Sequence, residues 1–283
     1  MKTIDDNRRA IILLMVGMFF ISINDMLIKY LADDYPLHQI VFIRSLIGIS
    51  ASVVVLQLEG GWRLLKTNQL GLHGVRAGLI VLANMTFFAA LAVMPLGAAT
   101  ALFFVSPLFI TLLAIPVLGE TVGPHRLIAI GIGFVGVLVM MAPGIDWGDI
   151  GRVSLILPVL AALCYAGTNV LTRKLGAQSA ASAMAIYIQG AFILVSFVFF
   201  LIAGDGRFMP YVNHDSLVFL LRSWVWPAPQ DWGPFAMIGL CSAAVGYTLS
   251  RAYKIGVPAT VAPYEYTLLP IAVFWGWAIF GEV

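Results

Sequence analysis

The sequence has little charge, few cysteines and few histidines. Lys, Arg, Asp and Glu make up 11% of the 283 residues, and the formal net charge is only +2. So small a basic excess gives no case for a nucleic-acid partner. The two cysteines, Cys164 and Cys241, have no CxxC spacing, and the four histidines are scattered along the chain. We therefore expect no metal site and no cofactor.

Hydrophobic residues are abundant instead, at 61% of the chain. A soluble domain has about 45–50%. A hydrocarbon core about 30 Å thick takes about 20 residues of helix per crossing. The apolar runs of this chain have that length and lack the polar and apolar alternation of membrane strands. The sequence therefore predicts an all-α, polytopic membrane protein with the lipid bilayer as its partner.

Nine apolar runs are long enough to be membrane spans. They cover residues 10–31, 37–57, 72–93, 97–118, 124–142, 153–175, 180–203, 233–254 and 258–280. The connections are mostly short, so neighbouring spans are expected to be antiparallel. The first run is as long as a full span, which favours a retained anchor over a cleaved signal peptide.

The distribution of basic residues predicts the orientation of the chain. One side of the membrane receives Lys2, Arg8, Arg9, Arg63, Lys66, Arg76, Arg126, Arg173, Lys174, Arg251 and Lys254, and the other receives only Arg152, Arg207 and Arg222. Cytoplasmic loops carry the excess of Lys and Arg. We therefore expect an inner-membrane protein with a cytoplasmic N-terminus.

One pattern occurs twice along the chain. An interval of 162 residues places Gly119-Glu120 on Gly281-Glu282, and an interval of 145 places Asn24 on Asn169. A repeat of five spans crosses an odd number of times, so its second copy is inverted, as in secondary transporters. Residues 1–142 are predicted to form the first repeat. Residues 143–283 would form the second with four spans, and a tenth helix is expected to be missing.

The paired motifs are Ser106-Pro107-(x)11-Gly119-Glu120 and Glu265-(x)4-Pro270-(x)10-Gly281-Glu282. On these motifs the chain resembles the EamA type of the drug/metabolite transporter superfamily. The resemblance implies ten helices in two inverted five-helix repeats and the efflux or exchange of small metabolites. The chain departs from the Trp-Gly-Ser/Asn run of many relatives, because its first span has Ile21-Ser22-Ile23-Asn24-Asp25 instead.

The transported solute is open to several interpretations. We expect a monomeric transporter that exports amino acids, aromatic ones in particular, by alternating access. Uptake of a vitamin or nucleoside-like metabolite and proton-coupled drug export are alternatives. A membrane-embedded enzyme would need a clustered nucleophile and base, which the sequence does not show. No nucleotide-binding P-loop is present, so a solute or proton gradient would supply the energy.

Charged residues inside spans are candidate site residues, since each costs a few kcal/mol to insert. Asp25 and Lys29 are four residues apart, a spacing that allows a pair on one helical face. Asp25 and Arg44 lie at similar depths in neighbouring spans. These three residues are predicted to form an ion pair or gate, or to contact a charged substrate.

Amide, hydroxyl and aromatic side chains near mid-span are predicted to line a central substrate site. The candidates are Asn24, Asn84, Phe88, Tyr165, Asn169, Tyr247, Tyr264 and Glu265. Glu265 would carry a proton, pair with a cationic group of the ligand, or form a structural hydrogen bond. Helix breaks are predicted at Pro107, Pro263 and Pro270, because proline removes a backbone donor and weakens a helix.

Overall fold

A computed structural model of the chain describes residues 4–121, residues 152–282 apart from 177 and 212–214, and isolated positions between 123 and 136. The described residues form helices and connections, with no strand among them. Most of the predicted fifth span, residues 124–142, lies outside the described residues.

Long helices occupy the other predicted spans, and their ends agree to within a few residues except at the N-terminus. They are α1 (Ile4–Leu31), α2 (Leu37–Glu59), α3 (Leu70–Leu91), α7 (Arg152–Leu175), α8 (Ala181–Ala203) and α10 (Trp232–Ile255). Seven stretches of the described residues are long and apolar enough to cross a membrane. The predicted all-α, polytopic fold is therefore confirmed.

Two predicted spans are divided into shorter helical segments. Residues 97–118 form α4 (Leu96–Phe103) and α5 (Ser106–Leu118), with Pro107 as the second residue of α5. Residues 258–280 form α11 (Pro258–Val261), the 3-10 helix η4 (Ala262–Thr267) and α12 (Leu268–Phe280). Pro263 is the second residue of η4 and Pro270 the third of α12. Proline is tolerated at a helix start, where its missing N–H has no helical partner, so it suits these breaks.

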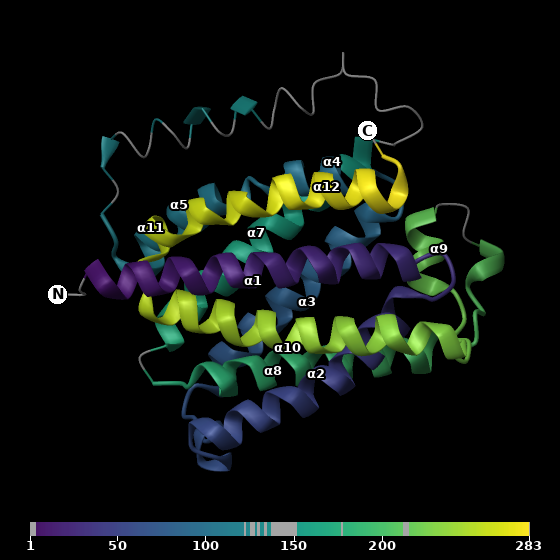
Figure 1. The fold of residues 1–283 in the computed structure, drawn as a ribbon, viewed down its shortest axis with the longest axis horizontal. Coiled ribbons are helices and arrows are strands. Elements are labelled where there is room, and N and C mark those ends of the chain that lie inside the picture. Colours follow the sequence, from purple (N-terminus) through teal and green to yellow (C-terminus); the bar gives the residue numbers. More distant parts are fainter. Residues whose placement is uncertain are drawn as a thin grey trace.

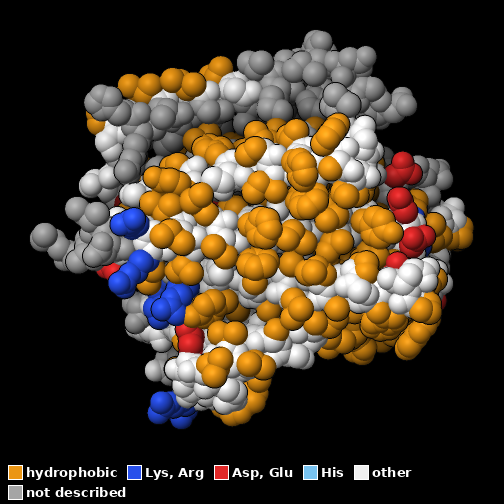
Figure 2. All heavy atoms as spheres, viewed as in Figure 1, with side chains coloured by type: hydrophobic (Ala, Val, Ile, Leu, Met, Phe, Trp, Pro, Cys, Tyr) orange, Lys and Arg blue, Asp and Glu red, His pale blue; other side chains and the backbone are white. Residues whose placement is uncertain are grey.

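The helices lie side by side in one bundle (Figure 1). The α1 helix packs against α10 and α12, α3 packs against α7, and α2 packs against α8 and α10. The broken spans also meet, because α4 packs against α12. Figure 2 shows a broad hydrophobic surface along one face of this bundle, as expected of a surface that contacts lipid.

Short helical segments connect the long helices at the bundle ends. They are η1 (Trp62–Leu65), η2 (Met209–Tyr211), α9 (Asp215–Leu221) and η3 (Pro229–Asp231). Side chains at the start of α2 and just before it hold the longest of these connections. The Tyr35 hydroxyl donates to Asp231 Oδ2 at 2.6 Å, and the Gln39 amide exchanges hydrogen bonds of 2.5 and 3.1 Å with the backbone of Val225.

Helices α2 and α10 approach each other closely at a pair of glycines, Gly48 and Gly239. A Cβ atom at Gly239 would lie 2.5 Å from Cβ of Ile47 and 3.1 Å from the carbonyl oxygen of Arg44. Small residues allow such close packing between membrane helices. The crossing therefore sets the position of the α2 backbone at Arg44.

We predict that Gly239→Ala destabilises the protein. Overpacking costs about 1–3 kcal/mol, which outweighs the gain of up to about 1 kcal/mol from replacing a helical glycine with alanine. Gly190→Ala is the matched control, because a Cβ at that position in α8 would meet nothing within 4 Å. Thermal unfolding in detergent measures both variants. Equal melting temperatures would contradict the close approach of α2 and α10.

Candidate functional site

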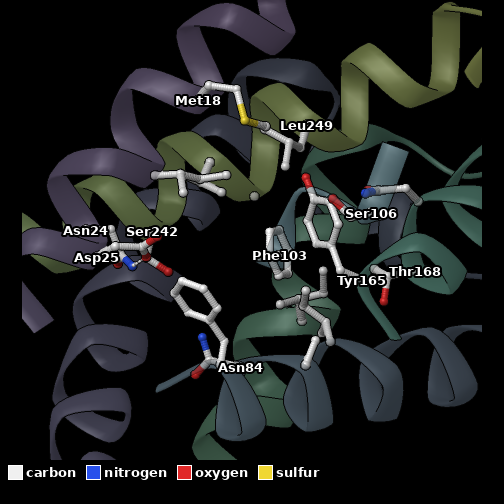
Figure 3. Close-up of a pocket in the computed structure, with 18 of the residues that line it drawn as sticks. Met18, Asn24, Asp25, Asn84, Phe103, Ser106, Tyr165, Thr168, Ser242 and Leu249 are labelled. Carbon is white, nitrogen blue, oxygen red and sulfur yellow. Dashed lines mark hydrogen bonds between the residues drawn. The ribbon is translucent and has the colours of Figure 1, made fainter. Parts of the chain in front are cut away.

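A cavity of about 160 Å³ lies between the two halves of the bundle. Its walls come from α1, α2, α3, α4, α5, α7, α8, α10, η4 and α12. Because one water needs about 10–15 Å³ of such volume, the cavity has room for a small organic solute. Figure 3 shows Asn24, Asp25 and Ser242 on one side of this cavity, with Ser106, Tyr165 and Thr168 on the opposite side.

Most of the predicted substrate-binding and ion-pair residues meet at this cavity. Those that line it are Asn24, Asp25, Arg44, Asn84, Phe88, Tyr165, Asn169 and Glu265. The predicted residues Tyr247, Tyr264 and Lys29 do not line it. The structure thus brings together side chains from both halves of the chain.

Asn24 lies between the two charged residues that were expected to pair directly. Its Nδ2 donates to Asp25 Oδ1 at 3.1 Å, and Arg44 Nη1 donates to its Oδ1 at 3.4 Å. Asp25 and Arg44 themselves make no ion pair within 4 Å. An amide can bridge the two charges because it both donates and accepts. The Arg44 guanidinium also lies 4.9 Å from the ring centroid of Phe192, a cation–π distance.

Lys29 does not pair with Asp25, contrary to the expectation from their spacing. It forms an ion pair with Glu282 and donates to the carbonyl oxygen of Met94 at 3.3 Å. The other carboxylate oxygen of Glu282 accepts from the backbone N–H of Leu96 at 2.9 Å. This contact joins the ends of α1 and α12 to the start of α4. Its acidic partner is 253 residues away in the sequence, which the local spacing could not reveal.

Glu265 is buried among three hydroxyl groups, with 2% of its surface exposed. Tyr165 donates to its Oε1 at 3.0 Å, Tyr253 donates to the same oxygen, and Ser106 donates to Oε2 at 3.4 Å. Hydrogen bonds to a carboxylate are stronger than those between neutral groups. Ser106 begins α5 and Glu265 lies in η4, so the two broken spans meet at this carboxylate.

Two predicted tyrosines point elsewhere because of their helical positions. The cavity-lining residues of α10 are Ser242, Val245, Gly246, Leu249 and Ser250, which form one helical stripe. Tyr247 falls outside that stripe and donates to Glu59 at 3.0 Å, near the end of α2. Tyr264 has 42% of its surface exposed.

Several cavity residues were missed by the sequence analysis. Arg76, counted there as a loop charge, is 2% exposed inside α3 and lines the cavity. Gln189 was not among the predicted site residues, although a mid-span amide is the same signal that identified Asn84. The oxygens of both amides, Asn84 Oδ1 and Gln189 Oε1, are buried without a hydrogen-bond partner in the structure.

A bundle of apolar helices that encloses a polar cavity between two broken spans has the architecture of a membrane transporter. Comparison with known proteins shows which family the chain resembles. Residues 8–142 match the EamA-like transporter family. The resemblance predicted from the sequence motifs is thereby confirmed.

Similar proteins include transporters of different solutes. A riboflavin transporter of Brucella anthropi is 29% identical over 80% of this chain and 74% of its own length. A riboflavin transporter of Vibrio cholerae is 27% identical over 97% of this chain and 85% of its own length. An S-adenosylmethionine uptake transporter of Rickettsia prowazekii is 26% identical over 92% of this chain and 81% of its own length. A solved crystal structure matches this chain with a TM-score of 0.66, over 97% of this chain and 88% of the chain in that structure. Because the two sequences are 16% identical, this match shows the fold alone.

We predict that Asp25 and Arg44 are energetically coupled through Asn24. Removing one partner of a buried pair costs about 3–5 kcal/mol, because the other charge stays buried and uncompensated. The double variant Asp25→Asn/Arg44→Gln should therefore lose clearly less free energy of unfolding than the two single variants lose together. Chemical unfolding of the four proteins measures the coupling, and Asp33→Asn in an exposed connection is the control. Strictly additive effects would show that the bridge carries no coupling.

Proposed function

We propose that the chain is a secondary transporter that takes a small heteroaromatic metabolite, of vitamin or nucleoside type, across the inner membrane. The names of the riboflavin and S-adenosylmethionine transporters support this solute class. They give no support to the export of amino acids, which was the first expectation from the sequence. The vitamin or nucleoside alternative is therefore preferred.

The composition of the cavity wall is the observation that carries this proposal. Phe87, Phe103 and Tyr165 form a row of ring contacts, with 5.2 Å between centroids at each step. Such a wall suits the faces of a flat ring system. The unpartnered oxygens of Asn84 and Gln189 can accept hydrogen bonds from N–H groups at the edge of that ring. A heteroaromatic ring offers both features.

The two inverted repeats, residues 1–142 and 143–283, are part of the proposal. Cavity-lining positions recur at an interval of 162 residues: Ile80, Ala83, Asn84, Phe87 and Phe88 correspond to Ser242, Val245, Gly246, Leu249 and Ser250. The same interval relates Phe103 to Glu265 and Ser106 to Leu268, which also line the cavity. This recurrence supports a pseudo-two-fold axis through the cavity.

The side chains at corresponding positions differ in chemistry, although their positions recur. Asn84 corresponds to Gly246, Phe88 to Ser250 and Phe103 to Glu265. The aromatic wall therefore comes mainly from the first half, and the buried carboxylate comes from the second. A bound solute would lie asymmetrically, with its ring against α3 and α4.

The proposed orientation has a cytoplasmic N-terminus. Figure 2 shows Lys and Arg gathered at the end of the bundle where α1 begins, and Asp and Glu gathered at the other end of the visible face. This asymmetry supports the orientation, because basic residues are retained on the cytoplasmic side.

Alternating access requires each end of the bundle to open in turn. The Lys29–Glu282 contact closes one end between α1, α4 and α12. At the other end, Glu59 accepts from Ser182 at 2.5 Å and contacts Arg251 at 3.5 Å, which joins α2, α8 and α10. We propose that these two groups of contacts break alternately during transport.

The proposal predicts uptake of riboflavin or a nucleoside by proteoliposomes that contain the protein. Asn84→Leu should weaken binding of the transported solute by about tenfold, since one lost hydrogen bond at a buried group costs about 1–3 kcal/mol. Thr86→Val is the control in the same helix, because Thr86 bonds only to its own helix. A panel of flavins, nucleosides and aromatic amino acids tests the solute class. Transport of amino acids alone would contradict it.

We predict that Glu265→Gln removes the response of transport to an imposed proton gradient. The glutamine oxygen can still accept from Tyr165 and Tyr253, and the glutamine NH2 group can donate to the Ser106 hydroxyl oxygen. Solute binding should therefore stay within about threefold of wild type, well under the 1.4 kcal/mol of a tenfold change. Asp33→Asn should respond like wild type. An unchanged response in Glu265→Gln would remove Glu265 as the proton carrier.

A further inference from the structure

Arg76 is a buried arginine of the cavity that makes no ion pair within 4 Å in the described part of the chain. Its Nε donates to the Thr172 hydroxyl at 2.6 Å, its Nη1 to the carbonyl oxygen of Met184 at 3.0 Å, and its Nη2 to the Ser250 hydroxyl at 3.0 Å. All three acceptors are neutral. The positive charge is therefore held in the bundle without a described counter-charge.

The other ionisable residues of the cavity have different surroundings. Arg44 and Asp25 are linked through Asn24. Glu265 accepts from three hydroxyl groups and makes no ion pair within 4 Å. Arg76 thus lacks the acidic neighbour that Arg44 has. A buried charge is costly unless it is paired, so this arrangement suits a residue whose counter-ion is brought by a ligand.

The hydrogen-bond count of the guanidinium shows what kind of ligand fits. A guanidinium has five N–H groups. The contacts with Thr172, Met184 and Ser250 use one N–H on each nitrogen, which leaves one on Nη1 and one on Nη2. One donor on each terminal nitrogen is thus left for the two oxygens of a carboxylate or phosphate, the groups that guanidinium binds most strongly.

The neutral contacts also fix the guanidinium in position. Thr172 belongs to α7, Met184 to α8 and Ser250 to α10, so three helices hold the plane of the group. Thr172 in turn donates to the carbonyl oxygen of Thr168 at 2.8 Å. A group held in this way loses little conformational freedom when an anion binds.

We propose that Arg76 binds an oxyanion, a carboxylate or phosphate group, of the transported solute. This inference rests on the proposed transport function and adds the charge of the substrate to it. The aromatic wall would receive the ring of the solute, while Arg76 receives its anionic group.

Matched pairs of solutes test the proposal on the purified protein. Riboflavin 5′-phosphate is compared with riboflavin, and tryptophan with tryptophanamide, by fluorescence titration. We expect the wild type to bind the member with the oxyanion at least tenfold more tightly in one pair. Arg76→Gln should abolish that preference, because it weakens binding of the member with the oxyanion at least tenfold more than binding of the other member.

Two further variants keep the test independent of folding. Arg76→Lys retains the charge but loses the two-pronged geometry, so a folded Arg76→Lys protein should keep only part of the preference. Arg173→Gln is the control, because Arg173 donates to the carbonyl oxygen of Lys254 and does not line the cavity. Its preference should equal that of wild type.

Other outcomes would overturn the inference. A wild type that binds both members equally, or an Arg76→Gln protein that weakens both equally, would reduce Arg76 to a structural tie between helices. Competition by added phosphatidylglycerol would assign the oxyanion to a lipid headgroup instead. Transport of flavins or nucleosides without any preference for an anion would overturn this inference alone, whereas no transport of any solute would overturn the proposed function.

Discussion

The burial of charged groups inside a membrane bundle constrains this structure more than any other interaction. Each ionisable side chain of the cavity must find partners where water and lipid offer few. Arg44 and Asp25 share one amide, Glu265 collects three hydroxyl groups, and Arg76 collects two hydroxyl groups and a carbonyl. These contacts join helices from both halves, so the polar cavity and the packing of the bundle depend on each other.

The helix breaks give the cavity its position. The breaks place helix ends between the two halves of the bundle. Ser106 begins α5 and Glu265 lies in η4, and the Ser106 hydroxyl donates a hydrogen bond to the Glu265 carboxylate. Aromatic side chains of α3 and α4 also line the cavity. A solute in the proposed site would contact aromatic rings as well as hydrogen-bonding groups. Such a combination suits small amphipathic molecules.

Much of this arrangement could be predicted from the sequence. The apolar runs predicted the helices, and polar residues at mid-span, such as Asn84 and Glu265, predicted the cavity wall. The partner of Lys29 could not be predicted, because Glu282 is brought to it only by the packing of α12 on α1. Arg76 was missed because a basic residue near the end of a span also fits a side chain that reaches the membrane surface.

The central claim is that one cavity opens to each side of the membrane in turn. The most direct test labels a single cysteine in the cavity with a membrane-impermeant thiol reagent. Ile21→Cys, in a protein whose Cys164 and Cys241 are replaced by alanine, places the thiol on the cavity wall. The account predicts labelling from either face of oriented vesicles and slower labelling when solute is bound. Labelling from one face only, at a rate that solute does not change, would contradict it.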